Sequence, residues 1–250
     1  MTHPARPGTE AFAFDGKDVG VLLLHGFTGS PQGLRLWGEA LRDAGFAVVC
    51  PVLPGHGSHW RDLALARHPA WAEACLAAID GLAVRYPKVV IGALSFGGAL
   101  AMHLCANRPA IVRGVVAVNP FLFSTDARLF ILPVLKHLVS SVPGVGSDIA
   151  DPQMKEIADE RVPLKTLASL RAFQSIVRQE LPRVTQPLRI YASRQDHVVN
   201  PSNARYISTQ VASKDVELVW LDRSYHVATL DHDRQQIFDG SIEFFRRVTR

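Results

Sequence analysis

The sequence contains only three cysteines among its 250 residues, Cys50, Cys75 and Cys105. A disulfide-stabilised scaffold needs a larger and even number of cysteines, so this class of protein is excluded. The scarcity fits a reducing compartment. Each cysteine lies in an apolar stretch, and we therefore interpret all three as small residues of the hydrophobic core.

Long apolar runs are also absent. The longest stretch without a charged residue, Val89 to Asn107, is interrupted by three glycines, a serine and a histidine. A membrane-spanning helix needs about 20 predominantly apolar residues. The first residues, MTHPARPGTEAFAFDGKD, lack the apolar segment of a secretory signal peptide. We therefore expect a soluble cytoplasmic protein without stable membrane insertion.

Positive charge is not concentrated anywhere in the chain. The formal net charge is +4, from 27 Lys and Arg residues against 23 Asp and Glu residues. The densest basic group, Arg246, Arg247 and Arg250, lies where a last helix would end and where cations favour the helix dipole. This distribution predicts that nucleic acid is not a partner. The oligomeric state is left open.

Apolar residues make up 48% of the chain and charged residues 20%, which excludes a disordered protein. Short apolar segments alternate with segments of helical periodicity, which predicts an α/β fold with a mostly parallel central sheet flanked by helices. The expected strands cover residues 19–24, 46–50, 89–94, 112–119, 188–192 and 216–221.

The alternation of strands and helices breaks off after residue 120. Between residues 121 and 181 no strand is evident, and an apolar run (LFILPVL) is followed by a Gly/Pro/Ser-rich stretch (SSVPGVGSD). The rhythm of strands and helices resumes near residue 188. We therefore predict a core formed by residues 1–120 and 182–250, with an inserted cap at residues 121–181.

Three polar side chains stand where predicted strands end. Ser95 follows the strand at 89–94, Asp196 follows the strand at 188–192, and His226 follows the strand at 216–221. Ligands bind outside the carboxyl ends of the strands of a parallel sheet. We therefore expect these three side chains to lie at one edge of the sheet.

The surroundings of Ser95 are typical of a nucleophile elbow. The sequence Ala93-Leu94-Ser95-Phe96-Gly97-Gly98 joins an apolar strand to an apolar helix. Such a turn presents the serine hydroxyl above the sheet, and small residues are needed because the strand and helix backbones nearly touch. Ala93 stands where this turn usually has a glycine, a departure of one methyl group.

A glycine-rich loop follows the first predicted core strand. Its sequence is His25-Gly26-Phe27-Thr28-Gly29, and such a loop can direct a backbone N–H toward the elbow. Together with the N–H that follows the serine, it would form an oxyanion hole. The candidate donors are the backbone amides of Phe27 and Phe96.

The segments LLLHGFTGS, PGHG, ALSFGG, SRQDHVVNP and SYHVATLD occur in this order along the chain. Taken together they resemble the α/β-hydrolase superfamily, and most of all small bacterial carboxylesterases and monoacylglycerol lipases. The resemblance covers nearly the whole chain and is vaguest in the cap. It implies that Ser95 is the nucleophile, Asp196 the acid and His226 the general base of a catalytic triad.

The chemistry of these residues agrees with that resemblance. A serine hydroxyl needs an adjacent base to become a nucleophile, and an acid orients the histidine. We predict a serine hydrolase that acts through an acyl-enzyme on small to medium-chain carboxylic esters, a class that includes monoacylglycerols. No cofactor is needed, and no set of metal ligands has a recognisable spacing.

The predicted cap is rich in apolar side chains. Among them Phe121, Phe123, Phe130 and Leu135 are our candidates for contact with the acyl part of the substrate, and the others would pack the cap onto the core. Two alternatives stay open. A thioesterase or an acyltransferase would use the same triad, and a ligand-binding protein could keep the fold without turnover.

Overall fold

A computed structural model of the chain describes residues 3–250. Its centre is a seven-stranded sheet with the strand order β1-β3-β2-β4-β5-β8-β9. All neighbouring strands are parallel except β1, which pairs with β3 in the antiparallel direction. The strands are β1 (Phe12–Phe14), β2 (Val19–Leu24), β3 (Ala47–Cys50), β4 (Lys88–Leu94), β5 (Val112–Val118), β8 (Leu188–Ser193) and β9 (Val216–Leu221). The predicted α/β architecture is confirmed.

The central strands are apolar along almost their whole length. β2 reads VGVLLL and β4 reads KVVIGAL, and nearly every residue in both is buried. A strand covered by helices on both faces has no solvent side, so the alternation of polar and apolar residues disappears. This explains why these strands can be located from the sequence.

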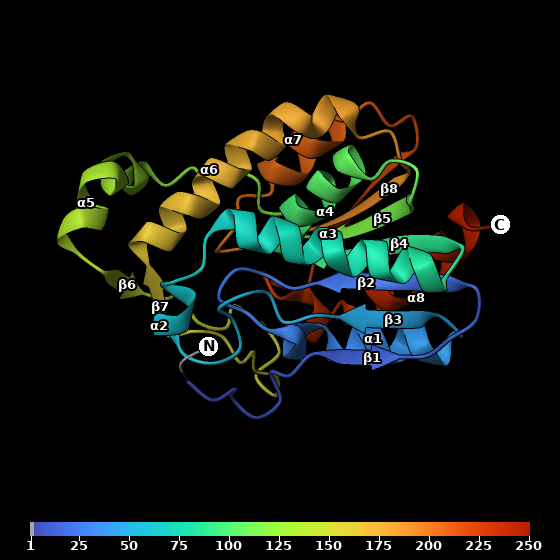
Figure 1. Cartoon of the computed structure of the whole chain (residues 1–250), viewed down its shortest axis with the longest axis horizontal. Helices are drawn as coiled ribbons and strands as arrows, with labels where there is room; N and C mark the ends of the chain where they lie inside the picture. Colours follow the sequence, from blue (N-terminus) through green and yellow to red (C-terminus); the bar gives the residue numbers. More distant parts are fainter. Residues whose placement is uncertain (1–2) are drawn as a thin grey trace.

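Helices cover both faces of the sheet (Figure 1). One core cluster joins the sheet to α3 (His68–Arg85), α4 (Phe96–Asn107), α6 (Leu164–Glu180) and α7 (Ser202–Gln210). The other joins it to α1 (Arg35–Asp43) and α8 (Arg234–Val248). Shorter helices are η1 (Pro31–Leu34), α2 (Trp60–Leu63), η3 (Leu181–Arg183) and η4 (Ala228–Leu230).

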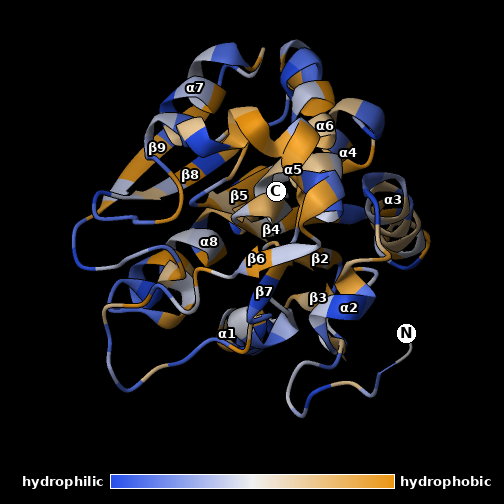
Figure 2. Cartoon of the chain, turned by 90° about the vertical axis from the view of Figure 1, so that its left-hand side faces the viewer, coloured by the Kyte–Doolittle hydropathy of each residue, from blue (hydrophilic) through white to orange (hydrophobic). Residues whose placement is uncertain are grey.

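Residues 121–181 begin with a part that stands outside the sheet. It holds η2 (Ala127–Ile131), α5 (Leu132–Leu138) and a two-stranded ribbon of β6 (Ser141–Pro143) and β7 (Arg161–Pro163). Figure 2 looks onto the end of the molecule where α5, β6 and β7 lie, and the carboxyl ends of the parallel strands face the same end. The segment then returns through α6, which packs on α4.

The pieces of regular structure that the sequence did not indicate are short. β1, β6 and β7 have three residues each. Three residues are too few to display a periodicity, and their pairing depends on a partner distant in the chain. Within residues 3–250, no helix is both long enough and apolar enough to cross a membrane.

Candidate active site

Ser95 occupies the sharp turn between β4 and α4. Its backbone has φ of 56° and ψ of −120°, a conformation that residues other than glycine rarely adopt. A Cβ atom added to Gly97 would lie 2.1 Å from the carbonyl oxygen of Leu24, so the helix approaches β2 as closely as a glycine allows. Ala93, in contrast, has its methyl group fully buried in the core on β4.

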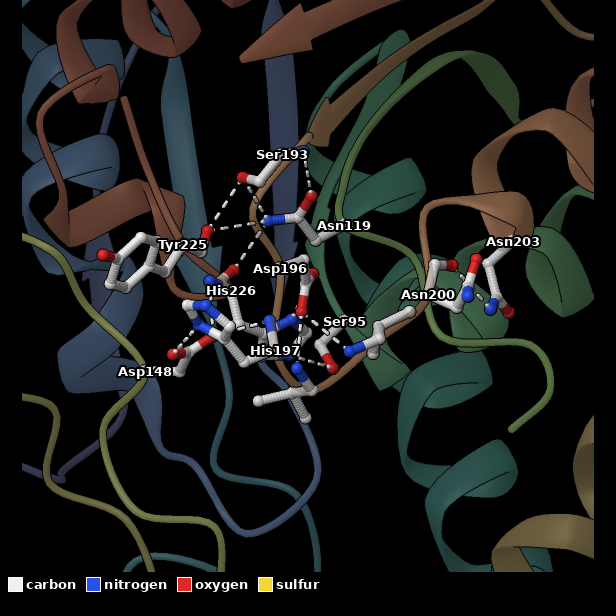
Figure 3. A network of polar contacts seen from close by, with 12 residues as sticks. Ser95, Asn119, Asp148, Ser193, Asp196, His197, Asn200, Asn203, Tyr225 and His226 are labelled. Atoms are coloured by element: carbon white, nitrogen blue, oxygen red, sulfur yellow. Dashed lines mark hydrogen bonds and ion pairs between the residues drawn. The ribbon is translucent and has the colours of Figure 1, made fainter. Parts of the chain in front are cut away.

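The three polar residues predicted to share one edge of the sheet lie in hydrogen-bond contact (Figure 3). The distance from His226 Nε2 to Ser95 Oγ is 2.9 Å. The distance from His226 Nδ1 to Asp196 Oδ2 is 2.8 Å. Asp196 lies in the loop after β8, and His226 lies in the loop after β9. The side chains are buried, with His226 only 8% exposed and Ser95 7%.

The Asp196 carboxylate is itself fixed by its own loop. Its Oδ1 accepts hydrogen bonds from the backbone N–H groups of Val198, at 2.8 Å, and Val199, at 2.7 Å. One oxygen therefore binds the loop while the other faces the imidazole. A carboxylate held in this way orients the ring and selects the tautomer with hydrogen on Nδ1.

The electrostatic surroundings of His226 favour its protonated form. Burial of the ring lowers the pKa of His226, but its hydrogen bond to Asp196 and the negative charges of Asp196, Glu156 and Asp148 raise it by more. The net pKa of His226 therefore lies above the ordinary value of 6.5. A base with a raised pKa accepts a proton more readily.

The glycine-rich loop after β2 runs directly beside Ser95. A Cβ atom on Gly26 would lie 3.2 Å from the Cβ of Ser95. Phe96 begins α4, so its N–H is one of those without an acceptor inside the helix. The backbone N–H of Phe27 has no acceptor among residues 3–250. The two candidate oxyanion donors thus belong to segments that meet at Ser95.

His25 braces this loop and is not part of the contact chain at Ser95. Its Nε2 accepts the N–H of Leu53 at 3.1 Å, and its Nδ1 lies 2.9 Å from the carbonyl oxygen of Gly26. Complete burial lowers the pKa of His25 to about 4, so the ring is neutral near pH 7. The Phe27 ring packs edge-on against Trp71 and Phe96.

Asn119 follows β5 at the same edge of the sheet and was not among the predicted site residues. Its side-chain amide donates to the carbonyl oxygen of His226 at 2.8 Å and to Ser193 Oγ at 3.0 Å. Its Oδ1 accepts the N–H of Ser193 at 2.7 Å. The strand-end rule that located Ser95 applies equally to Asn119 and would have found it.

Glu156 brings a second carboxyl group to the site from residues 121–181. A Cβ atom on Gly29 would lie 2.8 Å from Glu156 Oε1, and one on Gly33 would lie 3.5 Å away. Burial raises the pKa of Glu156 to about 7. The charges of Glu156 and His226 influence each other's pKa. No sequence pattern marked this residue.

The four apolar residues predicted to contact substrate are spread over different environments. The backbone N–H of Phe121 donates to the carbonyl oxygen of Ser95 at 2.9 Å. Phe123 lines a cavity of about 440 Å³ between α5 and α6. Leu135 is partly buried on α5, whereas the Phe130 side chain is 84% exposed. Their role toward a substrate stays a prediction.

Comparison with known proteins places this arrangement in a family. A sequence profile described as "Alpha/beta hydrolase family" matches residues 21–239. The chain belongs to the α/β-hydrolase family. It is 35% identical over 247 residues to a thermostable monoacylglycerol lipase of Bacillus sp. (strain H-257), which covers 98% of this chain and 97% of the relative.

Two further comparisons agree with this assignment. The α/β-hydrolase is 28% identical over 240 residues to a carboxylesterase of Bacillus subtilis (strain 168), covering 95% of this chain and 96% of the relative. A solved structure from work on two metagenome-derived lipolytic enzymes superposes with a TM-score of 0.94 at 36% identity. That match covers 98% of this chain and all of the solved one. The predicted family is confirmed.

Proposed function

We propose that this α/β-hydrolase cleaves small to medium-chain carboxylic esters, monoacylglycerols among them, through an acyl-enzyme formed on Ser95. The observation that carries the proposal is the unbroken chain of contacts from Ser95 Oγ through His226 to Asp196, at 2.9 and 2.8 Å. These distances are those at which a base takes a proton from a nucleophile.

The steps follow from the placement of these groups. Ser95 Oγ attacks the ester carbonyl carbon while His226 Nε2 takes the hydroxyl proton, and Asp196 stabilises the imidazolium. The N–H groups of Phe27 and Phe96 hold the tetrahedral oxyanion, each contributing on the order of 10²–10³ in rate. His226 returns the proton to the departing alkoxide, which leaves as the alcohol. A water molecule, activated by His226, then hydrolyses the acyl-enzyme to the free acid.

The alcohol part of the substrate would meet a polar surface. Glu156 stands beside the glycine-rich loop, and its carboxyl group can accept hydrogen bonds from free hydroxyl groups. A glycerol ester carries such hydroxyl groups, whereas a simple alkyl ester has none. The acyl part would lie under residues 121–181, which we propose act as a cap.

The test is p-nitrophenol release from p-nitrophenyl esters of two to sixteen acyl carbons. In parallel, the release of decanoic acid from glycerol monodecanoate and from methyl decanoate is compared at equal concentration. We expect release to peak at one chain length, and the glycerol ester to react faster than the methyl ester. Ser95→Ala should reduce the rate by at least about 10³-fold. Ser208→Ala, on α7, where the hydroxyl donates to the carbonyl oxygen of Arg205, serves as the control with wild-type activity.

Labelling with a fluorophosphonate separates this proposal from the alternative of a ligand-binding protein. An activated Ser95 gains the mass of the reagent, and Ser95→Ala does not. A folded protein that releases no nitrophenol and gains no mass would contradict the proposal. Faster cleavage of acyl thioesters than of matched esters would instead favour the thioesterase alternative.

A further inference from the structure

Asp148 contacts the loops of both His226 and Asp196 (Figure 3). It lies in the segment between β6 and β7, far from either loop in sequence, and its side chain is only 13% exposed. Its Oδ2 accepts the backbone N–H of His226 at 3.1 Å and that of His197 at 3.2 Å. Its Oδ1 lies 2.9 Å from His197 Nδ1.

These bonds connect two loops that the sheet supports separately. His197 follows Asp196 in the loop after β8, and His226 lies in the loop after β9. The backbone of Asp148 adds a second link to the loop after β9, because its carbonyl oxygen accepts the N–H of Val227 at 3.1 Å. A single residue therefore bonds to both loops whose separation sets the contact between His226 and Asp196.

Hydrogen bonds from two different parts of the molecule hold the backbone of His226. From the sheet, the Asn119 amide donates to the carbonyl oxygen of His226 at 2.8 Å. From the segment between β6 and β7, Asp148 accepts the N–H of the same residue. Asn119 is itself held by β8, because it bonds to the N–H and the hydroxyl of Ser193, so the sheet side of the loop persists when Asp148 is changed. The loss of Asp148 should thus loosen the loop without unfolding the protein.

We propose that Asp148 is a positioning residue, which holds the His226 and Asp196 loops at the separation required for proton transfer from Ser95. The proposal rests on the proposed function of the triad. Asp148 itself does not touch Ser95, and it acts on the reaction only through His226 and the loop of Asp196. Residues 121–181 would then supply part of the support of the triad.

The charge of Asp148 provides a second effect, which a purely structural role would lack. The charged groups that face His226 are Asp196 from the loop after β8, and Glu156 and Asp148 from the segment between β6 and β7. His197, the titratable group paired with Asp148, comes from the loop after β8. Because the charge of Asp148 raises the pKa of His226, its removal should shift the titration of His226 to lower pH.

The test compares Asp148→Asn with Asp151→Asn. Asp151 lies on the same segment but pairs with Arg234 and has no bond to His226. For Asp148→Asn we expect kcat to fall by about 10-fold with KM within twofold, since a loss of pre-positioning acts on the reaction and not on binding. The acid limb of the pH–rate profile should move to lower pH. Asp151→Asn should retain the wild-type profile and rate.

The titration of the His226 ring, followed by NMR in the resting protein, reads the same effect without turnover. A downward shift of the His226 titration in Asp148→Asn, and not in Asp151→Asn, would support the proposal even if no ester substrate were found. This readout separates a failure of the Asp148 proposal from a failure of the proposed function. An unchanged titration together with an unchanged kcat would overturn it. A lower kcat together with an unchanged His226 titration and a lowered melting temperature would also overturn it, because Asp148 would then be structural only.

Discussion

At the scale of single residues, the charge balance around His226 decides the pH at which the proposed reaction operates. His226 must be neutral to accept the proton of Ser95, so activity should rise with pH as the ring loses its proton. Burial lowers the pKa of His226, but Asp196, Glu156 and Asp148 raise it by more. We therefore expect the midpoint of the kcat/KM profile above pH 6.5.

Glu156→Gln tests the origin of this shift. The variant removes one of the charges that raise the pKa of His226, so its kcat/KM midpoint should lie below that of the wild type. Because the pKa of Glu156 is raised to about 7, the wild-type profile should also be broader than a single titration, and that of Glu156→Gln should not. The measurement is kcat/KM between about pH 5 and pH 9. A rate independent of pH over this range would contradict a histidine base.

At the scale of elements, the end of α8 nearest the site is attached to its surroundings by Asp231. In the structure its carboxylate is fully buried and accepts four backbone N–H groups, those of Ala150, Asp151, Tyr225 and His232. This one side chain ties the segment between β6 and β7 to the loop of His226.

Asp231→Asn should therefore destabilise the protein far more than an exposed substitution on α8. The amide keeps one acceptor oxygen but turns an N–H donor toward backbone donors, and hydrogen bonds to a charged group contribute roughly 1.5–3 kcal/mol each. We expect a loss of at least about 3 kcal/mol in the free energy of unfolding, measured by urea denaturation. Asp239→Asn, exposed on α8, should stay within about 0.5 kcal/mol.

The same scale explains what the sequence could and could not predict. β2 and β4 are almost entirely apolar because helices cover both faces of the sheet. Ser95 directly follows β4, at the edge of a parallel sheet where ligands bind, so the apolar pattern of the strand also locates the candidate nucleophile. Asp148 and Glu156 lie in an irregular segment, where no periodicity constrains a side chain's direction. Their approach to His226 depends on bonds between residues far apart in the chain, which a local pattern does not contain.

At the scale of the whole molecule, the sheet separates two apolar layers, and each layer contains at least one cysteine. Cys50 on β3 belongs to the layer under α1 and α8, whereas Cys75 on α3 and Cys105 on α4 belong to the opposite layer. All three thiols are free and buried. Burial raises the pKa of each, to about 12 for Cys75. Since the thiolate is the reactive form, the folded protein should react with no thiol reagent.

Thiol labelling during urea unfolding can therefore report on the two layers separately. Both apolar layers pack on the same sheet. Neither layer can therefore unfold without exposing strands against which the other layer packs. We expect Cys50, Cys75 and Cys105 to become reactive at one urea concentration, which coincides with the loss of helical circular dichroism. Cys50→Ser and Cys105→Ser assign the labelled sites by mass. Labelling of Cys50 well before Cys105 would mean that the layer under α1 and α8 unfolds on its own, and that the sheet does not make the two layers cooperative.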